Sequence, residues 1–441
     1  MPTSQVEKQM FERFGLESVP QHMKQTTWLE YFIIQLAFSV NSGNFLVPAL
    51  AVLEGGLSFF GAVSATILGA GSAFFFVSLL SLPGVKYGLP AQYVIRTMLG
   101  TRFTRFIASP VRAVTSLYWF SVQTIGGTFV LQSLYHLMTG NTLPFVPLAL
   151  LLAFIMTVLA LVGFDAVKKA TKWFMPILII GQFLMLFLFI QKGIQQPLSI
   201  FPKEQALSIP AFFFFASLAF VQYVSGVSAS ADVARYAKSE QHAFWGLFSG
   251  NMIGFTMTAV LASFSATLFE SSNPFIASSE ITSSSFFLLL ISLCSVVSMI
   301  SINLSNAYTG GFSLLNAIPS LGRVKASLLF GVTGITISCF PVLVDEAKIF
   351  ISLLGALVIP ISAVIIINYL FVKKQQISAT DLNVLQNGSY HWNISALVTV
   401  IFAFLLYLVL PEGWSPGFFA FFVACGLYFI LASSKQKTSS L

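Results

Sequence analysis

Apolar stretches long enough to cross a membrane recur from Trp28 to the end of this chain, with short polar segments between them. A helix needs about 20 apolar residues to cross the roughly 30 Å hydrocarbon core of a bilayer. The chain has 441 residues, of which 56% are hydrophobic and 8% charged, so little sequence is left for a soluble domain. The sequence therefore predicts an all-α polytopic membrane protein.

The hydropathy pattern predicts about 12 transmembrane helices. The spans cover residues 28–53, 57–82, 109–139, 143–163, 170–191, 211–231, 243–269, 284–308, 327–344, 349–372, 393–410 and 416–433. With the amino terminus inside, only Lys192, Lys203 and Lys348 of the 22 Lys and Arg residues fall in outer segments. The others are assigned to cytoplasmic segments, including Arg112 at the start of the third span. This asymmetry follows the positive-inside rule and predicts a multi-pass protein of the inner (cytoplasmic) membrane with both termini in the cytoplasm.

The polar segments outside the spans give two further expectations. The first 26 or so residues lack an apolar core and do not resemble a signal peptide. Residues 83–110, between the second and third spans, are rich in basic residues. We expect them to form a membrane-hugging cytoplasmic loop with no part in substrate binding.

Two spans carry a Ser-Gly pair among polar residues at their centre. The first span contains Asn41, Ser42 and Gly43, and the sixth contains Ser225 and Gly226. Irregular backbone is tolerated inside a membrane only where it lines a cavity or packs against protein. One such pair is most often a close helix contact. Its recurrence about half a chain apart instead predicts inverted repeats with a site between two discontinuous helices, spans 1 and 6.

Further buried polar residues lie in the third, sixth and eighth spans. Trp119 and Gln123 are one turn apart on one helix face, Tyr223 lies in span 6, and Asn303 and Asn306 lie in span 8. Aromatic faces can stack on a planar ring, and amides both donate and accept hydrogen bonds. These residues suit a neutral heterocycle such as a nucleobase. Ordinary helix packing and interhelical hydrogen bonding are the alternative.

Residue types that are missing from the spans exclude other functions. No carboxylate or imidazole is expected near the membrane midplane, and neither a nucleophile–base pair nor a metal-ligand cluster is visible. The sequence thus predicts no enzyme, no organic cofactor and no nucleic-acid partner. A coupling cation would have to be bound by hydroxyls and freed backbone carbonyls. Such ligands suit hard cations and favour sodium over a proton.

Four parts of the chain resemble the nucleobase:cation symporter-1 family, in its cytosine and purine permease branch. They are residues 15–20 with 26–29, 81–90 with 119–124, 231–238, and 303–311. The resemblance implies a leucine-transporter-type fold, a 5+5 inverted repeat plus two extra helices. It implies the following division: a cytoplasmic amino-terminal segment 1–27, five-helix repeats 28–192 and 205–375, additional transmembrane helices 390–433, and a cytoplasmic tail 434–441.

The resemblance also implies roles for residues of the substrate site. Trp119 matches the family's ring-stacking tryptophan, and Gln123 matches a glutamine one turn later. Tyr223 falls at a second stacking position where Trp or Phe is usual. Ser225 falls where the cytosine branch uses the backbone and hydroxyl of helix 6, and Asn306 matches the asparagine that binds the base.

For sodium, the resemblance implies carbonyls near Ala37 and Val40 together with Ser298 and Ser301. We therefore expect a symporter that imports a nucleobase, cytosine first, with sodium by alternating access. Purines, hydantoin, allantoin or hydroxymethylpyrimidine remain alternative substrates, and a proton remains an alternative coupling ion. A ligand-gated channel or a substrate-sensing receptor on the same fold is a different class that stays open. Membrane lipids are expected partners.

Overall fold

The computed structural model describes residues 17–160, 164–195, 208–386 and 390–439, and in these residues the regular structure is helical. Each predicted span coincides with a helix or a bent helix pair. These are α1 (Trp28–Ser39) with α2 (Ser42–Leu53), α3 (Phe59–Leu79), α8 (Ser109–Thr139), α9 (Phe145–Ala160), α10 (Phe164–Gln195), α12 (Ile209–Val224), α14 (Glu240–Phe269), α16 (Ser285–Ala317), α17 (Gly322–Ile337), α19 (Ala347–Ile367), α21 (Ile394–Val409) and α22 (Pro416–Ser439). Seven described helices are long and apolar enough to cross a membrane, or eight spans if the bent pair counts as one.

Shorter elements connect the spans. They are η1 (Gln21–Met23), α4 (Leu82–Tyr87), α5 (Ala91–Val94), α6 (Arg96–Leu99), α7 (Thr101–Phe103), η2 (Thr104–Ala108), η3 (Ser225–Ser228), α13 (Ser230–Ala234), α15 (Pro274–Glu280), η4 (Pro319–Leu321), α18 (Val342–Asp345), η5 (Asn368–Val372), α20 (Ala379–Gln386) and η6 (Glu412–Trp414).

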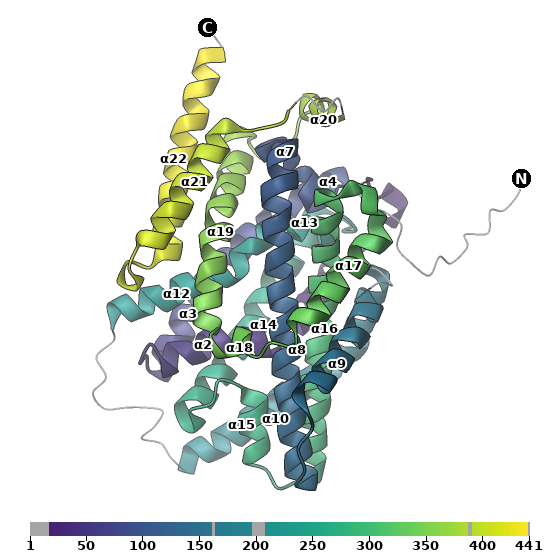
Figure 1. The fold of residues 1–441 in the computed structure, drawn as a ribbon, viewed down its shortest axis with the longest axis vertical. Helices are drawn as coiled ribbons and strands as arrows, with labels where there is room; N and C mark the ends of the chain where they lie inside the picture. The colour runs from purple at the N-terminus through teal and green to yellow at the C-terminus, as the bar shows by residue number, and fades with distance from the viewer. Residues whose placement is uncertain (1–16, 161–163, 196–207, 387–389, 440–441) are drawn as a thin grey trace, which may run out of the picture.

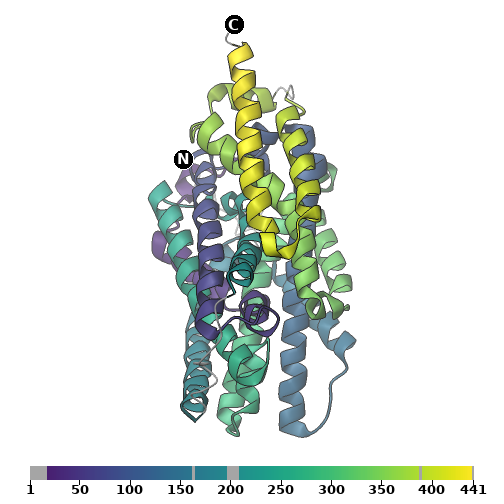
Figure 2. The same ribbon diagram turned by 90° about the vertical axis from the view of Figure 1, so that its left-hand side faces the viewer.

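The long helices run roughly along the long axis of the molecule, with α8 through its middle (Figure 1). α8 packs on α16, α1 on α14, and α12 on α3. The last two helices, α21 and α22, pack on each other and on α19 and lie on the side of the molecule that faces the viewer in Figure 2. Helices α4, α7 and α20 lie at the end of the molecule where the chain finishes (Figure 1).

The predicted break in the first span is confirmed. α1 and α2 meet at a bend of 59°, and Val40 and Asn41 between them are extended. The Asn41 side chain caps α2 by accepting a hydrogen bond from Asn44 N, and its own amide donates to Phe38 O. Asn44 Nδ2 donates to Ser39 O. The asparagines thus pair the backbone groups that the break exposes, which makes it tolerable in an apolar environment.

The sixth span is also discontinuous, as predicted. Its regular helix α12 ends at Val224, earlier than the expected 231. A 3-10 turn follows, in which Ser228 Oγ donates to Ser225 O, and α13 begins after Ala229. The turn contains Ser225, Gly226 and Ser228, so the end of the regular helix lies at the polar residues from which the break was predicted.

The expectation that residues 83–110 form a loop on the membrane surface was wrong, because this segment is largely helical and folds against the helical core. Gln92 is fully buried, and its amide donates to Ser228 O beside the break in span 6 at 2.7 Å. Arg96 hydrogen-bonds Asn316, and Arg105 Nε donates to Ala317 O at the end of α16. Arg96 and Arg105 therefore dock on α16, and the segment is not a simple loop on the membrane surface.

Candidate functional site

A cavity of about 170 Å³ lies between the two broken spans. This volume is below the roughly 300–1,000 Å³ of pockets for drug-sized ligands, so the cavity suits a small molecule. Its walls come from α1, α2, α3, α8, α12, η3, α14 and α16. The predicted residues that line it are Trp119, Gln123, Tyr223, Ser225, Gly226 and Asn306.

Two aromatic side chains give the cavity flat faces. The Trp119 ring packs edge-on against Tyr118 with a centroid distance of 5.0 Å. The Tyr223 ring packs against Phe74 and Phe255, at 4.7 and 5.1 Å between centroids. These neighbours restrict both rings, so each can offer a preset surface to a planar ligand at a low entropic cost.

The Gln123 side chain hydrogen-bonds two residues at the break in the first span. Its Oε1 accepts a hydrogen bond from Gly43 N at 3.0 Å, and its Nε2 donates to Asn41 Oδ1 at 2.5 Å. A Cβ atom added to Gly43 would clash with Gln123 Nε2, so a larger residue at position 43 would displace this side chain. Asn41 and Gly43 are not among the cavity-lining residues. They belong to the layer behind it and hold Gln123 in place.

Gln222 connects the two breaks. Its Nε2 lies 3.2 Å from Asn44 Oδ1 and 3.4 Å from Gly43 O, where it can donate to both. Its Oε1 is buried and accepts no hydrogen bond from the described residues. Gln222 was not among the residues predicted for the site. Its position directly before Tyr223, a predicted site residue, could have indicated that it lies near the site.

Asn306 lines the cavity, while Asn303 lies behind it. Asn306 Nδ2 donates to Asn303 Oδ1 at 3.1 Å. Asn303 is fully buried, and its amide donates to Phe120 O and Thr124 Oγ1 of α8. Asn303 therefore orients Asn306 and ties α16 to α8, and it does not reach the cavity itself.

Ser42, the remaining residue predicted for the substrate site, packs against α8. A Cβ atom added to Gly126 would lie 2.5 Å from Ser42 Cβ, so the backbones of α2 and α8 approach closely there. Ser42 does not line the cavity. For Ser42, the geometry is that of a close helix contact, the more common explanation of a Ser-Gly pair in a membrane helix.

Arg112 was assigned to a cytoplasmic segment, but its side chain lines the cavity. Nη1 donates to Ser225 Oγ at 3.1 Å and Nη2 to Thr309 Oγ1 at 3.2 Å. Among the described residues, no carboxylate oxygen lies within 4 Å of this guanidinium. The helix period could have indicated this position, because Arg112 is seven residues before Trp119 and therefore lies on the same face of α8.

Asn251 of α14 also lines the cavity, and sequence analysis did not single it out. A lone asparagine in a long apolar span gives no local sign of the partner that it faces. Together with Gln35, Asn44 and Gln222, it makes the cavity rich in amides.

The residues expected to bind a cation lie at the break in the first span and on α16. The side chains of Asn41 and Asn44 occupy the carbonyls of Phe38 and Ser39, which leaves those of Ala37 and Val40 available. On α16, Ser298 Oγ donates to Ser295 O. Two other hydroxyls, Ser295 Oγ and Ser301 Oγ, are buried without a hydrogen-bond partner among the described residues.

α1 and α16 are in contact, so these neutral oxygens fit a hard cation chemically. The described residues contain no group of three His, Cys, Asp or Glu side chains that could bind a metal ion. A cation here would therefore depend on carbonyls and hydroxyls alone.

Comparison with known proteins gives one family. The profile described as "Permease for cytosine/purines, uracil, thiamine, allantoin" matches residues 18–431. A curated relative, the purine-uracil permease NCS1 of Arabidopsis thaliana, is 25% identical over 417 residues, which cover 82% of this chain and 68% of the plant protein.

Solved structures share the fold. Mhp1, a nucleobase-cation-symport-1 family transporter, in a closed conformation with bromovinylhydantoin bound, matches with a TM-score of 0.78 and 16% identity over 95% of this chain and 93% of Mhp1. A Na+-coupled sialic acid symporter matches with a TM-score of 0.63 and 14% identity, covering 94% and 91% of the two chains. MhsT in complex with L-phenylalanine also gives 0.63, at 12% identity, covering 93% and 99%.

These matches confirm the predicted fold, the leucine-transporter type with discontinuous helices 1 and 6, and a non-enzymatic permease. Because the family profile covers nearly the whole chain, the protein belongs to the nucleobase:cation symporter-1 family of permeases for cytosine and purines, uracil, thiamine and allantoin.

Proposed function

We propose that this protein imports a nucleobase, cytosine first, in symport with sodium by alternating access. The observation that supports this most is the cavity itself. It is small, lies between two broken helices, and combines the faces of Trp119 and Tyr223 with a set of amides. Transporters with discontinuous helices bind substrate and ions at such breaks.

The buried acceptor on Gln222 favours a substrate with an amino group. Its Oε1 has no partner among the described residues, and leaving a buried acceptor unpaired costs about 1–3 kcal/mol. The exocyclic amine of cytosine is a donor that can pair with it. Purines, uracil, hydantoin, allantoin and hydroxymethylpyrimidine remain competing substrates, and a competition assay ranks them.

Sodium coupling is proposed because Ala37 and Val40 at the end of α1, and Ser301 on the neighbouring helix α16, supply neutral oxygens. In proteoliposomes, we expect an inward sodium gradient to drive concentrative uptake of cytosine, and a sodium-free proton gradient to drive none. Equal uptake under the proton gradient would contradict sodium coupling. Binding or ion current without concentrative uptake would indicate a receptor or a channel.

Trp119 should contribute stacking energy. We expect Trp119→Ala to weaken heterocycle binding by about tenfold to a hundredfold, because base–aromatic stacking contributes roughly 1–3 kcal/mol. Trp119→Phe should retain much of the affinity, since a π-face remains. Radioligand competition on purified protein measures both. Wild-type affinity in Trp119→Ala would place the substrate elsewhere, and the sodium dependence of binding in both variants serves as the control.

Asn306 should affect selectivity as well as affinity. Asn306→Ala removes an amide from the cavity wall, so we expect both the affinity and the rank order of competing pyrimidines and purines to change. The matched control is Ser305→Ala, which truncates a neighbouring cavity-lining residue without removing an amide. If Asn306→Ala keeps both affinity and rank order, Asn306 does not read the base.

Arg112 should be needed to hold the cavity wall together. Arg112→Ala removes the guanidinium that links Ser225 of the broken span to Thr309 of α16. Hydrogen bonds to charged groups contribute about 1.5–3 kcal/mol each, so uptake should fall by tenfold or more. Arg105→Ala is the control, because Arg105 is exposed at its contact with Ala317 O and lies outside the cavity. If uptake by Arg112→Ala equals that of both the wild type and Arg105→Ala, Arg112 has no role at the site.

A further inference from the structure

A second cavity, of about 410 Å³, lies at the end of the molecule that carries α20 and shares no lining residue with the first. It lies between the end of α19 with η5, the helix α20, and the two last helices α21 and α22. Polar side chains on its walls come from η5 and the residue after it, from α20, α21 and α22, and from the segment before α21. They include Asn368, Lys373, Asp381, Tyr390, Asn393 and Tyr428.

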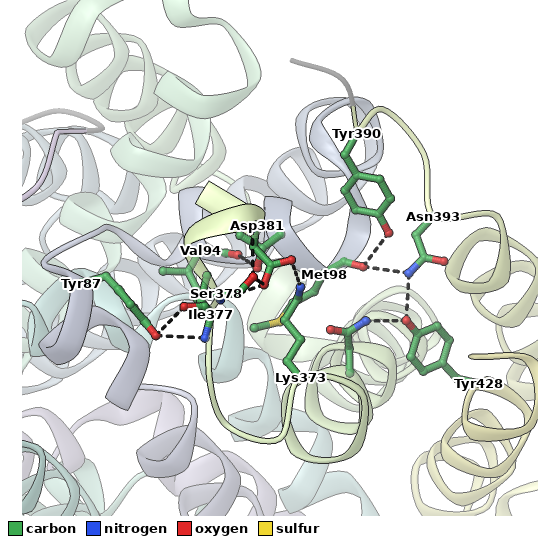
Figure 3. Close-up of polar contacts among 12 residues, drawn as sticks. Tyr87, Val94, Met98, Lys373, Ile377, Ser378, Asp381, Tyr390, Asn393 and Tyr428 are labelled. Atoms are coloured by element: carbon green, nitrogen blue, oxygen red, sulfur yellow. Dashed lines mark hydrogen bonds and ion pairs between the residues drawn. The ribbon is translucent and has the colours of Figure 1, made fainter. Parts of the chain in front are cut away.

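One wall carries an ion pair. Lys373 Nζ lies 2.5 Å from Asp381 Oδ1, with the two side chains 11% and 27% exposed (Figure 3). Asp381 Oδ2 accepts hydrogen bonds from Ser378 N and Ser378 Oγ. Burial would raise the pKa of Asp381, but the hydrogen bonds from Lys373 and Ser378 hold it below its ordinary value. Near neutral pH this wall therefore presents a cation and an anion side by side, with no net charge.

A network of amides and phenols forms the opposite wall. Asn393 Nδ2 donates to Tyr428 Oη at 2.8 Å and to Met98 O at 2.8 Å (Figure 3). Asn368 Nδ2 also donates to Tyr428 Oη. Asn368 is 4% exposed, yet its Oδ1 has no hydrogen-bond partner among the described residues. An occupant that donates an N–H or O–H would satisfy this buried acceptor.

The position of the cavity points to a lipid. Its lining residues lie where three predicted spans end, which is the depth of a bilayer's headgroup region. Next to them in sequence are large apolar side chains on the outer surface: Phe371 is 55% exposed, Phe429 45% and Ile394 57%. The rings of Phe371 and Phe429 pack 5.6 Å apart. Acyl chains could lie along this surface while a headgroup enters the polar cavity.

We propose that this cavity binds the headgroup of a phospholipid with a primary ammonium, of the phosphatidylethanolamine type. The phosphate would lie beside Lys373, whose ammonium has donors left after pairing with Asp381. The lipid ammonium would donate to Asp381 and to Asn368 Oδ1. A choline headgroup has no N–H to donate, and an anionic headgroup would meet a lysine that Asp381 already neutralises.

The same region joins distant parts of the chain, so a bound lipid would stabilise that junction. Tyr87 at the end of α4 donates to Ile377 O at 2.8 Å and accepts from Ile377 N at 3.0 Å (Figure 3). Thr101 N donates to Tyr390 O and Asn393 N to Leu99 O. The folded segment before α8 is thereby connected to the linker before α21, next to the cavity.

The test is a headgroup series on the purified full-length protein. Phosphatidylethanolamine, its N-methyl and N,N-dimethyl forms and phosphatidylcholine, all with the same acyl chains, differ by one N–H at each step. We expect retention, measured by native mass spectrometry, to fall along the series, by about tenfold or more in total since hydrogen bonds to a charged group are lost. Phosphatidylglycerol should bind no better than phosphatidylcholine.

Variants check that this cavity is responsible. Asn368→Leu and Asp381→Asn should each flatten the series while the protein still binds its substrate. Lys348→Gln is the matched control, since Lys348 pairs with Glu412 and Glu54 in a different cavity, and it should leave the series unchanged. Equal retention of all four lipids by the wild type would overturn the proposal. So would retention of phosphatidylglycerol as strong as that of phosphatidylethanolamine, or an unchanged series in Asn368→Leu.

Discussion

Two glutamine side chains hold the broken helices of this protein together. Gln123 pairs with Gly43 N and Asn41 at the first break, and Gln222 lies within hydrogen-bonding distance of Gly43 O and Asn44. A break inside a bilayer exposes backbone groups that lipid cannot satisfy, so such a break persists only where protein pairs them. These amides pair backbone groups that the break exposes, and this pairing lets the irregular backbone that borders the cavity persist in the membrane.

Gln123 lines the cavity and also makes the interhelical hydrogen bonds that were the alternative expectation. Its Oε1 and Nε2 atoms both hydrogen-bond the first span, so the side chain positions the break. Only the second lone pair of Oε1 and the second N–H of Nε2 are left for a ligand in the cavity. Asn303 acts similarly for Asn306. Residues that contact the cavity and residues that orient them form two layers, as in other binding sites where supporting hydrogen bonds restrict the contact residues.

Features carried by local sequence were predictable. The spans follow from apolar length, and the breaks follow from Asn, Ser and Gly inside those spans. Pairing between distant segments was not predictable. Nothing near Gln92 indicates that its amide reaches Ser228, and a charge at the start of a span, such as Arg112, is typical of the membrane surface. Only the helix period relates Arg112 to Trp119. It predicts that the two residues share a helix face, but it does not predict that Arg112 binds Ser225 and Thr309.

The central claim is that substrate binds between the two breaks. A cryo-electron microscopy structure with saturating cytosine and sodium tests it most directly. The account predicts density for a planar ring between Trp119 and Tyr223, with Asn306 and the Oε1 atom of Gln222 within hydrogen-bonding distance of its edge. Density for the ring at any other position, with this cavity empty, would contradict the account.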